Sequence, residues 1–597
     1  MREGSPVFRH RIYISKIQKR MFFLSFATAF IAVFTMTLAV LIDNVIVCVF
    51  YGETEIAAVS LASPFFYLLE IPAAGLATGI QTVCARDLGG GKIDKVDRQF
   101  NQIFFFAAAL LTILTAFSFL SVPRMAVLFG GRGRTAALRP LAAEYLYGLS
   151  FEIVPYVLFC IMTPIVILDN GNRLISIASI CGCMTDIVLD LLSVRFGWGL
   201  FGIGLATSAS ALVYFMISIL HFLRHDRVIR LHFVMIRFTE LKEILFSSAP
   251  KAFLSLADTF RSLLFISLVS FTGGVAGTFV YSLHGTISYT ILIIAEGIAG
   301  AVGMLTGICC GEKNGEDLEG VSVLALRYNV FLSIGTIAIL AVSAYPLSIA
   351  LTETDASAEL LLFALICIMF TVPFSILVHC RISYLQAVGL IREAQWMGVS
   401  SDLTVLTMSA ALLAVRFGVR GVFMAFPVSQ IAILIFSWLL HWRRTGKIFP
   451  SVSDYLEVGD SFFPEPGDVI SYPVVTMEDC ALASEQVMLF CKGHRTDGRK
   501  GFLAGLCVEE LTTNVIGHGI KPGQPINTAD IRVVIDGEDV IIRTRDGGSA
   551  FNLKRFADRL KAEELSESGT GIRILVNSAK NISYYRTYGM NTTIIRV

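Results

Sequence analysis

The chain has few charged residues for its length. Asp, Glu, Lys and Arg make up 16% of its 597 residues, whereas hydrophobic residues make up 55%. A soluble globular protein usually carries about 25% charged residues. The net charge is only +1, so the composition gives no reason to expect a nucleic-acid partner. The shortage of charge favours a membrane protein.

Several common motifs are also missing from the sequence. No cysteine pair has the CxxC spacing of a zinc site in a polar context, and we interpret the 12 cysteines as reduced apolar residues. No GxxxxGK[ST] loop occurs, which argues against a pump driven by a P-loop ATPase. No cleavage-site pattern precedes the first apolar run, so we expect this run to be retained.

Long apolar runs recur between residues 21 and 445. Twenty helical residues span about 30 Å, the thickness of the hydrocarbon core of a bilayer, and about twelve runs approach this length. Basic residues in the N-terminal tail (1–20) and after the last run, such as Arg20 and Arg444, place both termini in the cytoplasm. We therefore predict an all-α polytopic membrane region.

Two motifs repeat along this region. GIQTVCARDLGGG starts at Gly79 and is similar to GMLTGICCGEKNG, which starts at Gly303, while GIGLATSAS at Gly202 is similar to GVFMAFPVS at Gly421. The two offsets are nearly equal, which predicts two halves of about six spans each, residues 21–225 and 226–445. Such repeats are common in secondary transporters, which bind their substrates between the halves.

Acidic residues occur inside the predicted spans. LAVLIDNVIV places Asp43 in the first span, and DIVLD places Asp186 and Asp190 one helical turn apart in the fifth. A carboxylate inside a membrane is costly and usually marks an ion or proton pathway. Because two carboxylates this close cannot both ionise cheaply, we predict a proton or Na⁺ switch. The alternative is that these residues lie near span ends and are solvated.

Residues 20–445 resemble the MATE family of multidrug and toxic compound extrusion transporters. The resemblance rests on LIDNVIVCVFYG, on GLATGIQTVCARDLGGGK, and on DIVLD followed by GLFGIGLATSAS. It implies twelve helices in two pseudo-symmetric six-helix lobes, and export of organic, often cationic, compounds against inward H⁺ or Na⁺. The implied coupling site consists of Asp43, Asp186, Asp190 and Thr207. At Asp186 the family more commonly has Asn, so the coupling ion stays open.

The composition changes after residue 445. Pro, Gly and acidic residues indicate a linker over 446–475, followed by a soluble domain over 476–597. Helical patterns cover 476–493 and 499–518, and strand patterns cover 531–536, 539–545, 582–588 and 592–597. We predict an α+β two-layer sandwich with helices on one face of a mixed sheet.

Three motifs of this domain resemble the GHKL ATPase superfamily, and most closely its serine-kinase branch, which includes bacterial anti-sigma factors. In chain order they are EELTTN, RDGGSAFN and SGTGIRIL. The resemblance implies Mg²⁺ and ATP as cofactors, Glu510 as the catalytic base, Asn514 as the Mg²⁺ ligand and Asp546 as the acceptor for the adenine amino group. It also implies a lid over 553–568. The implied nucleotide-binding residues are Asn514, Asp546, Gly548, Gly569 and Gly571.

Together, these patterns predict a multi-pass protein of a bacterial plasma membrane that exports organic cations by H⁺ or Na⁺ antiport. Its cytoplasmic domain would bind ATP and act as a regulatory or serine-kinase-like unit. The alternative is a receptor that keeps the transporter fold and signals through the kinase domain to a small protein, such as an anti-anti-sigma-like partner. The transported compound and the kinase target are not specified by the sequence.

Overall fold

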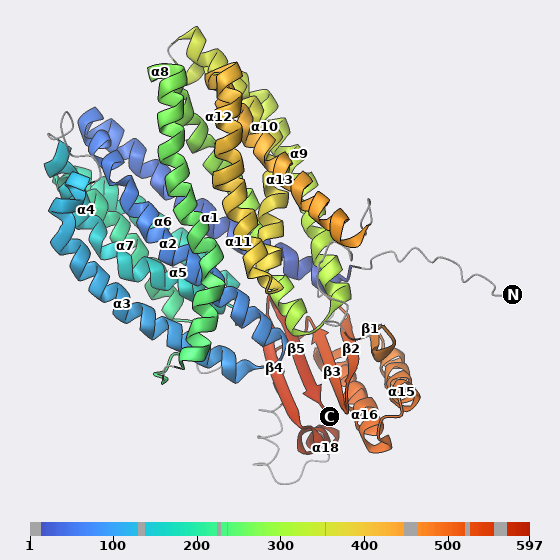
Figure 1. Cartoon of the computed structure of the whole chain (residues 1–597). Coiled ribbons are helices and arrows are strands. Elements are labelled where there is room, and N and C mark those ends of the chain that lie inside the picture. Colours follow the sequence, from blue (N-terminus) through green and yellow to red (C-terminus); the bar gives the residue numbers. More distant parts are fainter. Residues whose placement is uncertain are drawn as a thin grey trace.

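The computed structural model describes residues 14–128, 138–223, 229–235, 237–352, 354–446, 464, 466–519, 526–553 and 570–597. Figure 1 shows a bundle of long helices with a smaller part, built of one sheet and several helices, at one end. The described start of the chain and the end of the last long helix lie toward this same end of the bundle.

The first half of the bundle runs from α1 to α7. Its α4 continues through the short 3-10 turn η2 into α5, so these three elements act as one long helix. The elements are α1 (Lys16–Phe50), α2 (Glu53–Gly89), α3 (Ile93–Leu128), α4 (Arg139–Leu149), η2 (Ser150–Glu152), α5 (Ile153–Leu168), α6 (Asn172–Phe196) and α7 (Gly199–Ile219).

The second half runs from α8 to α13. Its first helix is broken at Gly274, whose φ of 58° is a left-handed conformation that glycine adopts at little cost. A π-helical turn, η3, joins α11 to α12. The elements are α8 (Phe238–Gly311), α9 (Gly315–Ala350), α10 (Asp355–Ala387), α11 (Ile391–Val399), η3 (Ser400–Thr404), α12 (Val405–Phe417) and α13 (Val419–Thr445).

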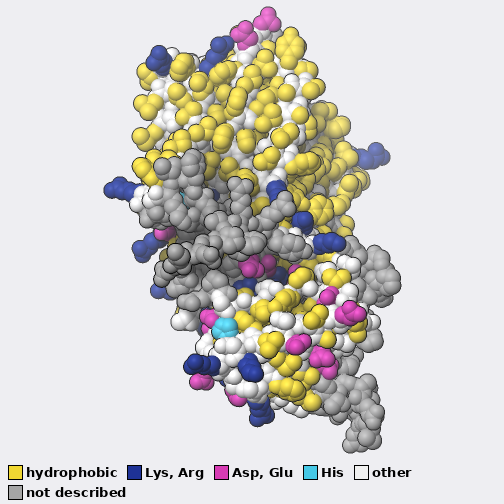
Figure 2. All heavy atoms as spheres, turned by 90° about the vertical axis from the view of Figure 1, so that its right-hand side faces the viewer, with side chains coloured by type: hydrophobic (Ala, Val, Ile, Leu, Met, Phe, Trp, Pro, Cys, Tyr) yellow, Lys and Arg dark blue, Asp and Glu magenta, His cyan; other side chains and the backbone are white. Residues whose placement is uncertain are grey.

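Among the described residues, 12 helical segments are long and apolar enough to cross a membrane, which confirms the prediction of a multi-pass membrane protein. Large apolar side chains are exposed on the outside of the bundle, for example Leu120 (81%), Phe271 (90%) and Val415 (90%). Figure 2 shows hydrophobic side chains covering much of the bundle, with charged side chains more frequent on the smaller part. Such a surface suits hydrocarbon rather than water.

The repeated glycine motifs meet where the two halves of the bundle pack together. A Cβ atom at Gly89, at the end of α2, would collide with the carbonyl group of Ile308 on α8. A Cβ atom at Gly311 would likewise collide with the carbonyl group of Arg86 on α2. Glycine is therefore required on both helices for this close approach of their backbones.

The C-terminal part contains a five-stranded sheet of order β1-β2-β3-β5-β4. One face of the sheet packs on α15 and α16 around an apolar core that includes Val487, Val508, Val533 and Ile542. The elements are η5 (Pro466–Asp468), β1 (Val469–Val474), α15 (Met477–Gly493), α16 (Gly498–Asn514), η6 (Val515–Gly519), β2 (Ala529–Asp536), β3 (Asp539–Asp546), α18 (Thr570–Ser578), β4 (Asn581–Thr587) and β5 (Met590–Arg596).

The structure differs from the sequence-based prediction at several points. All strand pairs of the sheet are antiparallel, so the predicted mixed sheet is wrong. The sheet begins with β1, which lies inside the segment predicted as linker. Pro473 weakens the strand pattern of this segment in the sequence, but a proline is tolerated here because β1 is an edge strand. The predicted helix over 499–518 changes to the π-helical turn η6 after Asn514. The first helix begins at Lys16, inside the predicted tail.

Candidate functional site

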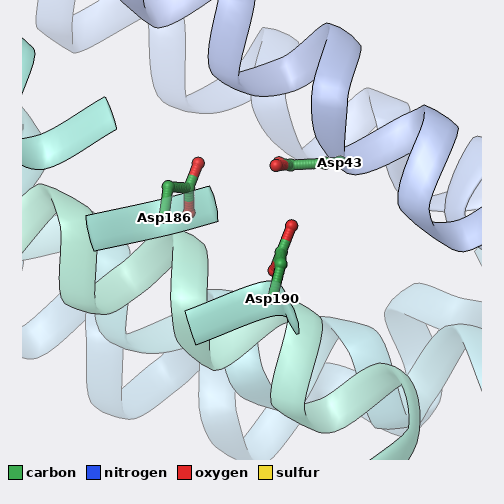
Figure 3. Close-up of side chains that lie close together, drawn as sticks. All are labelled: Asp43, Asp186 and Asp190. Carbon is green, nitrogen blue, oxygen red and sulfur yellow. The ribbon is translucent and has the colours of Figure 1, made fainter. Parts of the chain in front are cut away.

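Three buried carboxylates from two helices meet inside the first half of the bundle. Asp43 lies on α1, while Asp186 and Asp190 lie one turn apart on α6, which packs against α1. One carboxylate oxygen from each residue can be chosen so that all three lie within 4.8 Å of one another. Figure 3 shows the three side chains pointing toward a common space. The structure thus brings together all three acids that the sequence predicted.

These carboxylates have no cationic partner among the residues that the structure describes. Asp43, Asp186 and Asp190 are 7%, 1% and 0% exposed, so they are not solvated at span ends. Within the described parts of the chain, no Lys, Arg or His lies within ion-pair distance of them, and each has an oxygen without a hydrogen bond. Two charges 4.8 Å apart repel by ~3.5 kcal/mol at an effective dielectric constant of about 20. Protonation or a bound cation would remove this repulsion.

The geometry of the three carboxylates is compatible with protonation and with a bound cation. Oxygen ligands lie about 2.3–2.6 Å from a bound Ca²⁺, so oxygens up to about 5 Å apart can share one hard cation of similar size. Thr207, on the neighbouring α7, is buried, but its hydroxyl donates to the carbonyl group of Ile203 at 3.3 Å. No hydrogen bond between Thr207 and the acids occurs in the described structure. Its predicted role stays a prediction.

A fourth acid that the sequence analysis did not select lies in the same half. Glu152, in η2, is 6% exposed, and its Oε2 atom is buried without a hydrogen bond among the described residues. It interacts electrostatically with Asp186 and Asp43. The signal was present in the sequence, because Glu152 interrupts an apolar run in the same way as Asp43 does.

A second group of charged side chains also interrupts apolar runs. On α8, Lys251 Nζ lies 3.1 Å from Glu296 Oε1, and His379 Nε2 of α10 lies 3.8 Å from the same oxygen. On α2, Glu70 accepts a hydrogen bond of 2.9 Å from the hydroxyl group of Tyr156. Unlike the three aspartates, Glu296 has cationic partners, and Glu70 has a hydrogen-bond donor in Tyr156.

In the C-terminal part, the turn that follows the first predicted nucleotide motif contacts the second motif. Glu510 and Asn514 lie near the end of α16, and Asn514 Nδ2 donates to the carbonyl group of Glu510 at 2.7 Å. The π-helical turn after α16 then contacts the glycine loop after β3, where Ser549 N donates to Gly519 O at 3.0 Å. A Cβ atom at Gly548 would lie 2.7 Å from the same carbonyl oxygen, so this position needs glycine.

Asp546 is held rigidly at the end of β3. Its Oδ1 atom accepts hydrogen bonds of 2.8 Å from Gly548 N and from Asn591 Nδ2. Burial raises the pKa of the Asp546 carboxyl, although the bonds from Asn591 and Gly548 oppose the shift. No hydrogen bond to its Oδ2 atom occurs within the described ranges, which leaves an acceptor suited to an adenine amino group.

Only some of the other residues predicted to bind the nucleotide lie among the described residues. Gly571 lies in the first turn of α18. Gly569 and nearly all of the predicted lid (553–568) lie outside the described residues. The predicted site for Mg²⁺ and ATP is therefore described only in part.

The free face of the sheet is positively charged and docks onto the bundle. Arg532 and Arg543 lie directly opposite each other on β2 and β3, and Arg545 follows two residues later on the same face. Arg543 and Arg545 both pair with Glu312, whose side chain is only 1% exposed, and Tyr585 OH donates to Glu312 at 2.9 Å. Burial alone would raise the pKa of Glu312, but the two guanidinium groups outweigh it and lower the pKa below its usual value.

A tyrosine at the β4–β5 turn enters the bundle. Tyr588 is 1% exposed, and its hydroxyl lies 2.7 Å from Ser25 Oγ of α1 and 2.7 Å from Met304 Sδ of α8. Its φ of 53° is unusual for a residue other than glycine and costs about 1–2 kcal/mol. Next to it, Gly589 N donates to Asn170 Oδ1 at 2.6 Å.

These contacts join the C-terminal part to both halves of the bundle. Ser583 donates to Gly91 O at 2.6 Å in the first half, and Glu312 belongs to the second half. Gly91 and Glu312 lie in the two copies of the repeated glycine motif. This interface was not predicted from the sequence, although the R-x-R alternation at Arg543 and Arg545 is a sign of a charged sheet face.

Comparison with known proteins supports the membrane part of this account. The MatE family model matches residues 28–192. The "Probable multidrug resistance protein NorM" of Streptococcus pneumoniae serotype 4 is 26% identical over 200 residues, which cover 30% of this chain and 41% of that protein. The protein of the same name from another Streptococcus pneumoniae strain is 25% identical over 214 residues and is matched over 44% of its length. The chain thus matches less than half of each relative.

Solved structures match over almost the whole membrane region. A multidrug resistance MATE family transporter in an outward-facing conformation has a TM-score of 0.67 and 21% identity, covering 74% of this chain and 97% of that one. A MOP superfamily transporter from Pyrococcus furiosus has a TM-score of 0.65 and 21% identity, covering 73% and 97%. A variant of a Vibrio cholerae MATE transporter has a TM-score of 0.65 and 14% identity, covering 73% and 98%. The predicted MATE fold is confirmed.

Proposed function

We propose that this protein is a secondary active transporter that exports organic, often cationic, compounds in exchange for H⁺ or Na⁺. The observation that carries the proposal is the cluster of Asp43, Asp186 and Asp190, which is buried and has no cationic partner in the described part of the chain. The MATE fold and the likeness to a probable multidrug resistance protein support it.

The coupling follows from the electrostatics of the cluster. Protons or Na⁺ bound to the three carboxylates remove the repulsion between them and allow α1 and α6 to pack closely. Release of the ion restores the repulsion of ~3.5 kcal/mol per pair and favours an arrangement in which the acids separate or meet water. A gradient of this ion can thereby drive the halves of the bundle between two states, with the substrate carried between them. Thr207 would add a hydroxyl oxygen to the site.

We further propose that the C-terminal part is a GHKL-type two-layer domain that binds Mg²⁺ and ATP in the cytoplasm. Asn514 would hold Mg²⁺, and Asp546 with Gly548 would bind adenine, with Gly569 and Gly571 near the phosphates. The contact between η6 and the glycine loop supports this assignment. Basic residues around the ends of the first and last spans support the cytoplasmic placement of both termini. ATP would contribute binding and chemistry for phosphoryl transfer, with Glu510 positioned as the base for a serine hydroxyl.

The proposed nucleotide site lies beside the docking interface, so the domain can regulate transport. Arg586 Nη2 donates to Gly548 O at 3.2 Å and to Gly589 O at 3.3 Å. This arginine links the glycine loop after β3 to the turn that carries Tyr588. Because the docked domain contacts both halves of the bundle, it favours the arrangement in which their ends lie together. A nucleotide that shifts the glycine loop would change the stability of docking.

A second reading is a receptor that signals to an anti-anti-sigma-like protein, and the docked domain also favours it. Export of a fluorescent cation by a chain ending near Pro450 separates the two. If the shortened chain exports the cation, the bundle is a transporter and ATP is not its motor. If neither the full nor the shortened chain transports any cation of a broad panel, the transporter proposal fails.

The nucleotide site is tested by calorimetric titration of the purified full chain with Mg²⁺ and ATP. Asn514→Ala should abolish Mg²⁺-dependent binding, whereas Glu510→Ala should bind ATP normally and lose only phosphoryl transfer. Asp546→Asn should weaken ATP more than GTP, because only adenine offers the amino donor. No ATP binding by the wild-type protein would refute the assignment.

A further inference from the structure

A cavity of about 750 Å³ lies between the bundle and the C-terminal domain. It is bounded by the start of α1, by the α5–α6 loop with the first turn of α6, by the glycine loop after β3 and by the β4–β5 turn. The residues that line it are Arg20, Leu24, Asn170, Gly171, Asn172, Arg173, Leu174, Ile177, Gly547, Gly548, Ser549, Ala550, Arg586, Tyr588 and Gly589.

The charge in this cavity is entirely positive. Three arginines, Arg20, Arg173 and Arg586, line it, and no carboxylate does. In the described structure no acidic side chain lies within ion-pair distance of any of the three, whereas Arg543 and Arg545 on the docking face are both paired. The Nε atom of Arg586 is buried without a hydrogen-bond partner. Arg586 also interacts electrostatically with Asp546, but three guanidinium groups around one cavity still favour an anion between them.

Backbone groups add to the same preference. The helix α6 is 25 residues long, and its N-cap, Gly171, provides no side-chain cap. The first N–H groups of such a helix lack intrahelical acceptors and carry the positive end of the helix dipole. Asn172 and Arg173 place these groups in the wall of the cavity. Planar guanidinium groups and free backbone N–H groups together are the usual ligands of phosphate oxygens.

The cavity lies at the level where two membrane-spanning helices begin. Leu24 of α1 and Ile177 of α6 line it, and Ile177 is 53% exposed on the outside of the bundle. A phosphate group can therefore reach the cavity either on the headgroup of an anionic lipid or from water. Gly548 of the proposed nucleotide site lines the cavity, whereas Asn514 and Asp546 of that site do not.

We propose that this cavity binds a phosphate-bearing anion that bridges the bundle and the C-terminal domain. The anion is held by Arg20 and Arg173 from the bundle and by Arg586 from the domain. Because the ligand contacts both parts, its binding stabilises the docked arrangement. The site shares Gly548 with the proposed ATP site, but its three arginines are not part of that site, and it does not depend on transport activity.

The test uses the full chain in nanodiscs of phosphatidylcholine, with the temperature of unfolding as the readout. We expect this temperature to rise when phosphatidylglycerol is included, or when inorganic phosphate or ATP is added to discs without it. The first result identifies a lipid as the source of the phosphate, and the second a soluble compound. Arg20→Ala and Arg173→Ala should each weaken, by about tenfold or more, the binding of whichever probe raises the unfolding temperature. Lys19→Ala, an exposed neighbour on α1, should not.

Two further results decide the proposal. Asn514→Ala should leave the stabilisation intact, because Asn514 does not line the cavity. If none of the three probes raises the unfolding temperature, or if the arginine variants respond like Lys19→Ala, the cavity is not an anion site. Loss of the effect in Asn514→Ala would assign the phosphate to the ATP site and also overturn the proposal.

Discussion

Replacing Glu312 by alanine should release the C-terminal domain from the bundle. The carboxylate of Glu312 pairs with Arg543 and Arg545, whose side chains are only 9% and 5% exposed. Breaking a buried ion pair by removing one partner costs about 3–5 kcal/mol, because the remaining charge stays buried without compensation. Asp317 lies 3.4 Å from Arg543 and 3.5 Å from Arg545 and compensates in part. We therefore expect ~3 kcal/mol, or roughly a 100-fold loss in the docking equilibrium.

Hydrogen–deuterium exchange detects this release directly. The Gly589 amide donates to Asn170 across the interface, so it should exchange much faster in Glu312→Ala than in the wild type. Amides in the middle of α15 and α16, whose core lies on the other face of the sheet, should keep their protection. Asp355→Ala is the control, because Asp355 is an exposed acid at the start of α10. If Glu312→Ala exchanges like the wild type and Asp355→Ala, the docking energy does not reside in this ion cluster.

Three further predictions concern the same interface and the packing of the bundle. Arg543 and Arg545 hold the pKa of Glu312 below its usual value of 4.5. The docking free energy from these ion pairs should therefore be constant at neutral pH and be lost only as the pH falls below 4.5. Exchange of the Gly589 amide as a function of pH measures this loss. Tyr588→Phe removes only the hydroxyl contacts to Ser25 and Met304 and should cost about 1 kcal/mol of docking free energy. Tyr588→Ala also leaves a cavity and should cost about 3 kcal/mol or more. Equal effects of the two variants in the same exchange assay would contradict the inserted position of the ring. Gly311→Ala should lower the unfolding temperature by forcing α2 and α8 apart, whereas Gly493→Ala, with no neighbour within 4 Å, should not.

How much the sequence revealed depends on how local each feature is. The carboxylates of Asp43, Asp186 and Asp190 could be predicted because an acid in an apolar run is costly and needs a reason. The elements of the C-terminal domain could largely be predicted from periodicity, except for β1, where Pro473 and the edge position weaken the pattern. The positions of Glu312 and Tyr588 could not be predicted, because their burial depends on the docking of two parts that are distant in sequence. The burial of Glu152 near the three aspartates was not predicted, although an acid that interrupts an apolar run is visible in the sequence.

The central claim is that the three aspartates couple an ion gradient to export, and transport in proteoliposomes tests it most directly. With the wild-type chain, an imposed gradient of either H⁺ or Na⁺ should drive export of a fluorescent organic cation. Asp43→Asn and Asp190→Asn should each reduce export to the rate seen without a gradient, because an amide can neither release a proton nor neutralise Na⁺. Asp355→Asn, at an exposed acid outside the site, should transport like the wild type. Unchanged gradient-driven export in both site variants would contradict the account.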